Sequence, residues 1–270
     1  MNRTKIEWVK NPDGTQGYTW NPITGCLNGC EYCYARKLAN GRLRERYLAN
    51  RNTIPSDPLK NFASKEFDPK YIDPFYPRFW PERLLDIPFT EKPLGIFPCD
   101  MSDLFGIGIP EFWTEKVFVT INMYPEHRFY LLTKQPQNLI KWSPFPDTCW
   151  VGVTVCADGD ATNAYYGLSH IEAVKRFASF EPLLGAITMK SHRLLDVVDG
   201  VIIGAQTKPY KPPKIEWLQE IVEAADKAGI PVFLKDNLRP LLAKLTINDK
   251  WAWANNIGRG GVFRQEMPTK

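Results

Sequence analysis

Three cysteines close together constrain this chain more than any other feature. Cys26, Cys30 and Cys33 stand in the order Cys-x3-Cys-x2-Cys, with Tyr32 before the third. Cysteine thiolates are the usual ligands of iron–sulfur clusters. Three thiolates on one short loop can hold three corners of a [4Fe–4S] cube and leave the fourth iron for a small molecule. The spacing therefore predicts a cluster with one open iron.

Three other readings of these cysteines stay open at the level of sequence. A zinc knuckle needs four ligands, whereas the only histidines lie far along the chain, at His127, His170 and His192. A disulfide framework is typical of small secreted domains, and this chain has six cysteines in 270 residues. A closed, four-ligand cluster would recruit one more thiolate from Cys99, Cys149 or Cys156.

Length and composition predict one substantial core. The chain has 270 residues and is 44% hydrophobic, and single α/β barrels commonly reach this size. We expect one domain over residues 1–270. No run of 18 apolar residues predicts a membrane span, and the N-terminus lacks the apolar core of a signal peptide. We therefore expect a cytoplasmic protein with no membrane partner.

Short apolar runs alternate with helical patterns along the chain, which is typical of repeated βα units. Seven strands are expected, over residues 18–22, 94–97, 129–132, 150–155, 176–180, 200–204 and 231–234. Helices are expected over residues 34–50, 110–122, 136–142 and 213–228. The predicted fold class is α/β, as a partial or complete (β/α) barrel of the TIM type.

Two segments fall outside this alternation. Residues 51–93 are rich in Pro, Asp and aromatic residues and predict an irregular insertion after the first helix, with a short helix near 81–85. Residues 248–270, which include Trp251 and Trp253, fit neither a strand nor a long helix and form a C-terminal extension. We expect this extension to cover an open edge or to meet a partner.

Polar residues recur just past the ends of the predicted strands, at the rim where α/β barrels build their sites. They are Asp100, Ser102, Asp103, Lys134, Thr154, Cys156, Glu181, Gln206 and Lys235. The cysteine loop follows the first predicted strand and opens on the same face. We therefore expect one cavity lined by both, although for any one residue the plain alternative is a polar loop position.

Several further blocks carry a family resemblance. They are residues 4–8, 19–26, 101–105, 132–134 and 180–185. Together with the cysteine order, they resemble a phage-associated family of uncharacterised radical S-adenosylmethionine (SAM) proteins, distantly similar to the spore photoproduct lyases. The resemblance implies a barrel enzyme that uses a [4Fe–4S] cluster to cleave SAM reductively and abstract hydrogen from a small molecule or a nucleic acid. It also implies an electron donor such as a flavodoxin or ferredoxin.

The resemblance suggests roles for individual residues. Tyr32 would lie near the SAM adenine, and Asp100, Ser102 and Asp103 would accept from the SAM amino group. The residues that would contact SAM or the substrate are Thr154, Glu181, Gln206 and Lys235. Cys99 and Cys156 would return a hydrogen atom to a substrate radical. The competing reading is burial for the thiols and helix capping for the Asp and Ser side chains.

One segment departs from the family pattern. Members often carry Gly-Gly-Glu-Ser-Gly where residues 204–208 here read Gly-Ala-Gln-Thr-Lys. Gln206 therefore places an amide where the pattern has a carboxylate.

Two non-enzymatic classes also fit the sequence. Six basic residues crowd the first helix, namely Arg36, Lys37, Arg42, Arg44, Arg46 and Arg51, and the insertion interleaves Tyr71, Phe75, Tyr76, Phe79 and Trp80 with Lys70 and Arg78. Arginines with aromatic rings hold single strands and flipped bases, so a nucleic-acid-binding protein is one alternative. A non-catalytic sensor that binds the cluster and SAM is the other.

Overall fold

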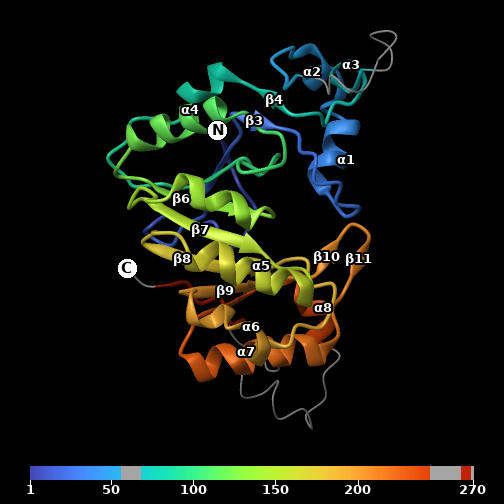
Figure 1. Cartoon of the computed structure of the whole chain (residues 1–270), viewed down its shortest axis with the longest axis vertical. Helices are drawn as coiled ribbons and strands as arrows, with labels where there is room; N and C mark the ends of the chain where they lie inside the picture. Colours follow the sequence, from blue (N-terminus) through green and yellow to red (C-terminus); the bar gives the residue numbers. More distant parts are fainter. Residues whose placement is uncertain (56–67, 244–262, 269–270) are drawn as a thin grey trace. The chain divides into compact units, whose positions relative to one another are not determined.

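The structure is a computed structural model that describes residues 1–55, 68–243 and 263–268. The chain divides into two compact units. Figure 1 labels their helices and strands. The first contains Met1–Lys5 and Val9–Gln135, and the second contains Ile6–Trp8 and Pro136–Lys270.

The first unit contains parallel strands beside a short antiparallel edge. Its strands are β1 (Asn2–Arg3), β2 (Tyr18–Trp20), β5 (Gly95–Pro98) and β6 (Arg128–Thr133). β1 pairs antiparallel with β2, whereas β2 with β5 and β5 with β6 are parallel pairs. A separate antiparallel ribbon joins β3 (Ile23–Thr24) to β4 (Arg78–Phe79). The ribbon links the start of the cysteine loop to the insertion.

The predicted helix over residues 34–50 is wrong as a single helix. It is divided into α1 (Tyr34–Asn40) and α2 (Arg44–Ala49). Gly41 ends α1, and its N–H donates to the carbonyl oxygens of Leu38 and Lys37. Glycine is a poor residue for a helix interior because it loses more backbone freedom than any other residue. The other helices of this unit are α3 (Pro69–Ile72), the 3-10 helix η1 (Pro81–Leu85) and α4 (Glu111–Asn122).

The second unit contains four parallel strands in the order β7, β8, β9 and β12. They are β7 (Cys149–Thr154), β8 (Lys175–Phe180), β9 (Gly200–Ile203) and β12 (Val232–Leu234). A hairpin of β10 (Gln206–Thr207) and β11 (Tyr210–Lys211) follows β9. The described part of the C-terminal extension runs along β12, where the Leu234 N–H donates to the Arg264 carbonyl at 2.8 Å. Trp251 and Trp253 lie outside the described residues.

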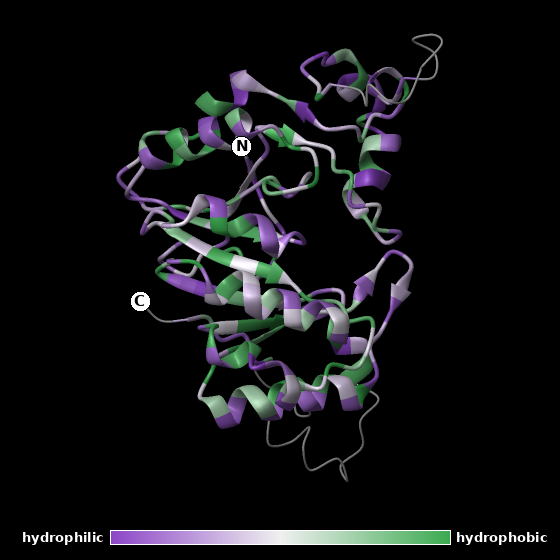
Figure 2. Cartoon of the chain, viewed as in Figure 1, coloured by the Kyte–Doolittle hydropathy of each residue, from purple (hydrophilic) through white to green (hydrophobic). Residues whose placement is uncertain are grey.

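The helices of the second unit include one strongly amphipathic element, α7 (Ile215–Ala228). Hydrophobic and hydrophilic residues alternate along it (Figure 2), and it buries Leu218, Ile221, Val222 and Ala225. Gly229 ends it in the left-handed region at φ 68°, a conformation that glycine commonly adopts at a helix end. The remaining helices are η2 (Pro136–Trp142), α5 (Asp158–Ser169), α6 (Met189–His192), η3 (Leu194–Asp196), η4 (Asp236–Leu238) and α8 (Arg239–Leu242). None of the helices in the described ranges has the length and apolar character needed to cross a bilayer.

The predicted α/β class is confirmed. Each of the seven predicted strands is present, and the strands that follow one another through a crossover pair in parallel. The pairings described for each unit are those of an open sheet and do not show a closed barrel. The insertion is irregular over its described residues, and η1 lies at the predicted position.

Replacement of Ile221 on α7 tests the burial of this helix face. Ile221 is fully buried, so we expect Ile221→Ala to lower the free energy of unfolding by about 2–5 kcal/mol through lost contacts and a cavity. Lys227→Ala replaces an exposed residue of the same helix. It should change the free energy of unfolding by less than about 0.5 kcal/mol. Urea denaturation followed by circular dichroism measures both, and equal losses would contradict the assigned helix face.

Candidate cluster-binding loop and a buried ion cluster

The cysteine loop runs from β3 to α1 in the first unit. All six cysteines of the chain are free thiols, and the three of the loop are partly exposed. The Cys26 Sγ accepts a hydrogen bond from the Asn28 N–H at 3.4 Å. Cys33 is the N-cap of α1, and its Sγ accepts from the Arg36 N–H at 3.3 Å. The backbone thus supplies donors to two of the three sulfurs.

Gly25 allows the loop to pack closely against the insertion. It has φ +85°, and a Cβ there would lie 2.5 Å from the carbonyl oxygen of Tyr76 and 2.6 Å from that of Phe75. Its N–H donates to the Met101 carbonyl at 2.9 Å. Both the left-handed backbone and the lack of space require glycine at this position.

A small hydrophobic core lies beneath the loop. Cys26 and Cys33 pack against it together with Leu38 and Leu43. Its buried members are Ala35, Ala39, Tyr47, Phe75, Trp80 and Met101. Two of these come from the insertion and two from α1, so the insertion forms part of the support of the loop.

Asp103 joins the loop to the end of β6. Its Oδ2 accepts from the Asn28 side chain at 3.1 Å and from the Lys134 N–H at 2.9 Å. Its Oδ1 accepts from the Thr133 hydroxyl at 2.7 Å and from the Phe105 N–H at 3.1 Å. Burial raises the pKa of Asp103, and these four donors oppose that rise. A carboxylate has about four acceptor positions, so those of Asp103 are filled.

The two other predicted acceptors are less enclosed. Asp100 accepts from the side chains of Asn21 at 2.5 Å and Tyr34 at 3.1 Å. Burial raises its pKa against these bonds. The Ser102 hydroxyl donates to the Gly25 carbonyl at 2.5 Å, which leaves its oxygen able to accept. Asp100 and Ser102 therefore keep a place beside the loop that suits a cationic amine better than Asp103 does.

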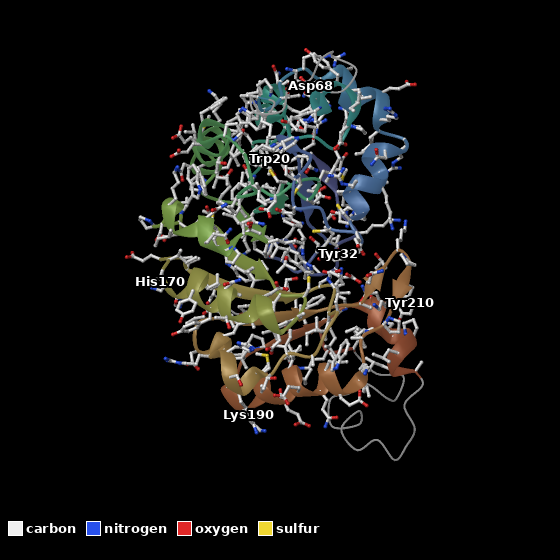
Figure 3. All side chains as sticks on the ribbon, turned by 45° about the vertical axis from the view of Figure 1, so that its right-hand side comes forward. Trp20, Tyr32, Asp68, His170, Lys190 and Tyr210 are labelled. Atoms are coloured by element: carbon white, nitrogen blue, oxygen red, sulfur yellow. The ribbon has the colours of Figure 1, made fainter. Side chains whose placement is uncertain are left out.

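The ring of Tyr32, in the loop, lies near the side chain of Lys134, which follows β6. The Lys134 Nζ lies 5.5 Å from the centre of the Tyr32 ring, a side chain labelled in Figure 3. Asn28 makes a second link, because its Oδ1 accepts from the Gln135 side chain at 2.9 Å. The structure thus gathers the loop, the residues after β5 and the end of β6 in the first unit, as their positions after strand ends predict.

Cys99 lies at the end of β5 in an unusual backbone conformation. Its φ is +61°, and only one other non-glycine residue in the described ranges has a positive φ. The left-handed region costs a residue with a Cβ about 1–2 kcal/mol. Cys99 is buried, and burial raises the pKa of its thiol. The hydrogen-donor role of Cys99 stays a prediction for a thiol that is closed off from solvent here.

The second unit contains a buried ion cluster of Lys235, Glu181 and Glu7. Lys235 is 9% exposed, and its Nζ contacts the Glu181 carboxylate and, at 3.2 Å, that of Glu7. Burial favours the neutral amine, but the two carboxylates together outweigh it and raise the pKa of Lys235. Lys235 is thus held as an ammonium by two acids.

Gly204 makes room for this cluster between β8 and β12. A Cβ on Gly204 would lie 3.0 Å from Cδ of Lys235 and 3.2 Å from Cγ of Glu181. The absent side chain lets the ion pair cross over β9. Asn237 holds Ala205, the residue after Gly204. The Asn237 side-chain amide accepts from the Ala205 N–H and donates to the Ala205 carbonyl, each at 2.9 Å.

The remaining predicted residues also lie in the second unit. Thr154 is buried at the end of β7, and Cys156 is partly exposed. The Gln206 side chain donates to the Pro209 carbonyl at 2.9 Å within the β10–β11 hairpin. The predicted residues thus form two groups, one in each unit, and the single cavity stays a prediction.

The sequence reading missed three residues that position these groups. Asn28 and Gln135 bridge the loop to β6, and Glu7 is the second acid on Lys235. Asn28 lies between two of the cysteines and Glu7 lies in the block 4–8, so their places in these motifs were the available signals. Gln135 carries no comparable signal.

The three loop thiols fit an iron–sulfur cluster in donor type, in number and in their place on one loop. Burial, followed by the Asp103 carboxylate and the other two cysteines, raises the pKa of Cys26 to about 12, so Cys26 carries a proton that a metal must displace. Within the described ranges, no three Cys, His, Asp or Glu side chains converge in a finished metal site.

Comparison with known proteins gives a family and no activity. Residues 3–240 match the family described as "Protein of unknown function (DUF5131)". The chain belongs to this family. No curated protein and no solved structure matches it. The DUF5131 match includes the cysteine loop, the Asp103 contacts and the Lys235 cluster.

Gly25→Ala tests the close packing of the cysteine loop. The new Cβ would clash with two carbonyl oxygens, so we expect a loss of unfolding free energy larger than the roughly 1–2 kcal/mol that the left-handed backbone alone costs. Gly29→Ala is the matched control, because Gly29 has φ +69° with no atom within 4 Å of a Cβ. Chemical denaturation of both variants measures the difference, and equal losses would contradict the packing.

Lys235→Met tests the buried ion cluster. Removing the ammonium leaves two acids facing each other, and we expect a loss of about 3–5 kcal/mol in unfolding free energy at neutral pH. Adding Glu181→Gln should restore part of the stability.

The control is Lys175→Met, which removes a partly exposed partner of Asp199 and should cost at most about 1 kcal/mol. Denaturant titrations of the three variants and of the unmodified chain measure these losses. An equal loss in Lys235→Met and in Lys235→Met/Glu181→Gln would contradict the electrostatic explanation.

Proposed function

We propose that this member of the DUF5131 family is a radical SAM enzyme. The observation that supports it best is the Cys-x3-Cys-x2-Cys loop, in which all three thiols are free and partly exposed. Cys26, Cys30 and Cys33 would hold a [4Fe–4S] cluster. Once bound, such a cluster supplies the electron that cleaves SAM and generates the radical that abstracts hydrogen from a substrate.

The residues around the loop have matching roles. The Asn28 and Arg36 N–H groups, which already donate to Cys26 and Cys33, are the kind of donors to cluster sulfurs that tune a reduction potential. Asp100 and Ser102 offer acceptors for the amino group of SAM, and Tyr32 offers a ring for its adenine. Asp103 acts as a positioning residue that fixes Asn28, and through it the loop, to the end of β6.

The proposal also includes the arrangement of the strands. We propose that the parallel strands form a partial (β/α) barrel, an assignment favoured by the polar residues just past the ends of β6, β8 and β12, namely Lys134, Glu181 and Lys235. In α/β barrels, sites are built at this end of the strands. A flavodoxin or ferredoxin in a reducing cytoplasm would be the electron donor.

Anaerobic reconstitution with iron and sulfide, followed by dithionite and SAM, tests the activity. We expect about four iron atoms per chain and the release of 5′-deoxyadenosine and methionine. Cys30→Ala should reduce product to background because one ligand is lost. Cys149→Ala, which removes a buried thiol outside the loop, should cleave SAM as the unmodified chain does.

The same assay separates the alternatives. A cluster that forms and binds SAM but never cleaves it would favour the non-catalytic sensor over the enzyme. Equal loss of iron in Cys149→Ala would point to a closed cluster with a fourth protein ligand. Tight binding of one zinc ion in place of iron and sulfide would overturn the proposal.

A further inference from the structure

The positive charge of the chain is concentrated directly after the cysteine loop. Residues 34–51 contain six basic residues and one acidic residue, a net charge of +5, whereas the whole chain carries +4. The rest of the chain therefore has a net charge of −1. A single short segment of this sign marks an interaction surface for a polyanion.

The folded segment presents this charge to solvent. The side chains of Lys37, Arg42, Arg44, Arg46 and Arg51 are exposed, and we name this set the basic surface. Glu45 is the only acidic residue of the segment. Within the part of the chain that the structure describes, the four arginines of the surface form no ion pair with a carboxylate. Hydrophilic residues recur along α1 and α2 in Figure 2.

Aromatic rings position part of this charge without neutralising it. The Arg46 guanidinium carbon lies 5.7 Å from the centre of the Trp80 ring, and that of Arg51 lies 5.1 Å from the Tyr71 ring. A cation–π contact holds a guanidinium in place while its charge stays available to an anion. The arginines are thus partly ordered before any ligand arrives.

The burial of the aromatic residues indicates which part of a nucleic acid this surface can contact. Phe75, Tyr76, Phe79 and Trp80 are all buried, so the base stacking expected of them from the sequence is wrong for these four. The exposed groups are cations, which contact phosphates and carry little sequence information.

We propose that the basic surface binds the phosphodiester backbone of a nucleic acid strand. An anionic membrane is a poorer partner, because an interfacial helix needs a broad apolar face and Tyr34 is the only large exposed hydrophobic residue of the segment. Lys37 lies on α1, whose N-cap is the loop residue Cys33, so a strand bound at this surface lies next to the loop. That this strand is the substrate rests on the proposed function.

Fluorescence anisotropy with a labelled 30-nucleotide DNA or RNA strand, at several salt concentrations, tests the surface. The variant Arg42→Gln/Arg44→Gln/Arg46→Gln should weaken binding at least about tenfold and lower the slope of log affinity against log salt by about 2. The matched control, Lys190→Gln/Lys211→Gln/Lys214→Gln, loses the same charge from exposed lysines of the second unit and should bind within about twofold of the unmodified chain.

Circular dichroism confirms that the triple variant is folded before binding is compared. Equal weakening in both triple variants, or an affinity that does not depend on salt, would overturn the proposal. So would tight binding to vesicles of anionic lipid without binding to either strand.

Failure here is distinguishable from failure of the proposed function. The unmodified chain can be assayed for strand binding before reconstitution and for SAM cleavage afterwards. SAM cleavage without strand binding would overturn only the basic surface. Strand binding by a chain that never cleaves SAM would uphold the surface and overturn only the enzyme.

Discussion

The buried carboxylate of Asp103 is the interaction on which the cysteine loop depends. Transferring an ionised carboxylate out of water costs several kcal/mol unless hydrogen bonds replace the lost hydration. The required donors come from the loop, from the turn after β5 and from the end of β6. All three must be in place at once, so the position of Asn28 between the cysteines is coupled to the strand ends. The strand ends therefore hold the loop together with the hydrophobic core beneath it.

The insertion connects this loop to the basic surface. Phe75 and Trp80 pack beneath Cys26 and Cys33, and the same two rings face the guanidinium groups of Arg36 and Arg46. The two rings thus pack against the loop cysteines and also hold the guanidinium groups of Arg36 and Arg46 in place. A change in the packing of this small core would therefore affect both the thiols and the surface that begins beside them.

The strands and the cysteine loop were predictable because each depends on neighbours in the sequence. Apolar runs indicate strands, and the thiol spacing predicts a ligand set that stays a prediction. The prediction of one helix over residues 34–50 is wrong at Gly41. The conformational entropy that glycine loses in a helix interior outweighs the apolar pattern around it. The role of Asp103 was beyond the sequence, since its partners Asn28 and Thr133 lie 75 and 30 residues away. The insertion aromatics were read as base-stacking groups, but their apolar area is worth more in the core.

The amide at Gln206 also has a local explanation. Its Nε2 donates to the Pro209 carbonyl within the β10–β11 hairpin, and a glutamate at this position would place an acceptor against an acceptor. Two carboxylates of the second unit, Glu181 and Glu7, contact Lys235, which balances part of their charge, and Gly204 leaves the space for this contact. The amide at Gln206 thus makes a hairpin contact that a carboxylate could not make.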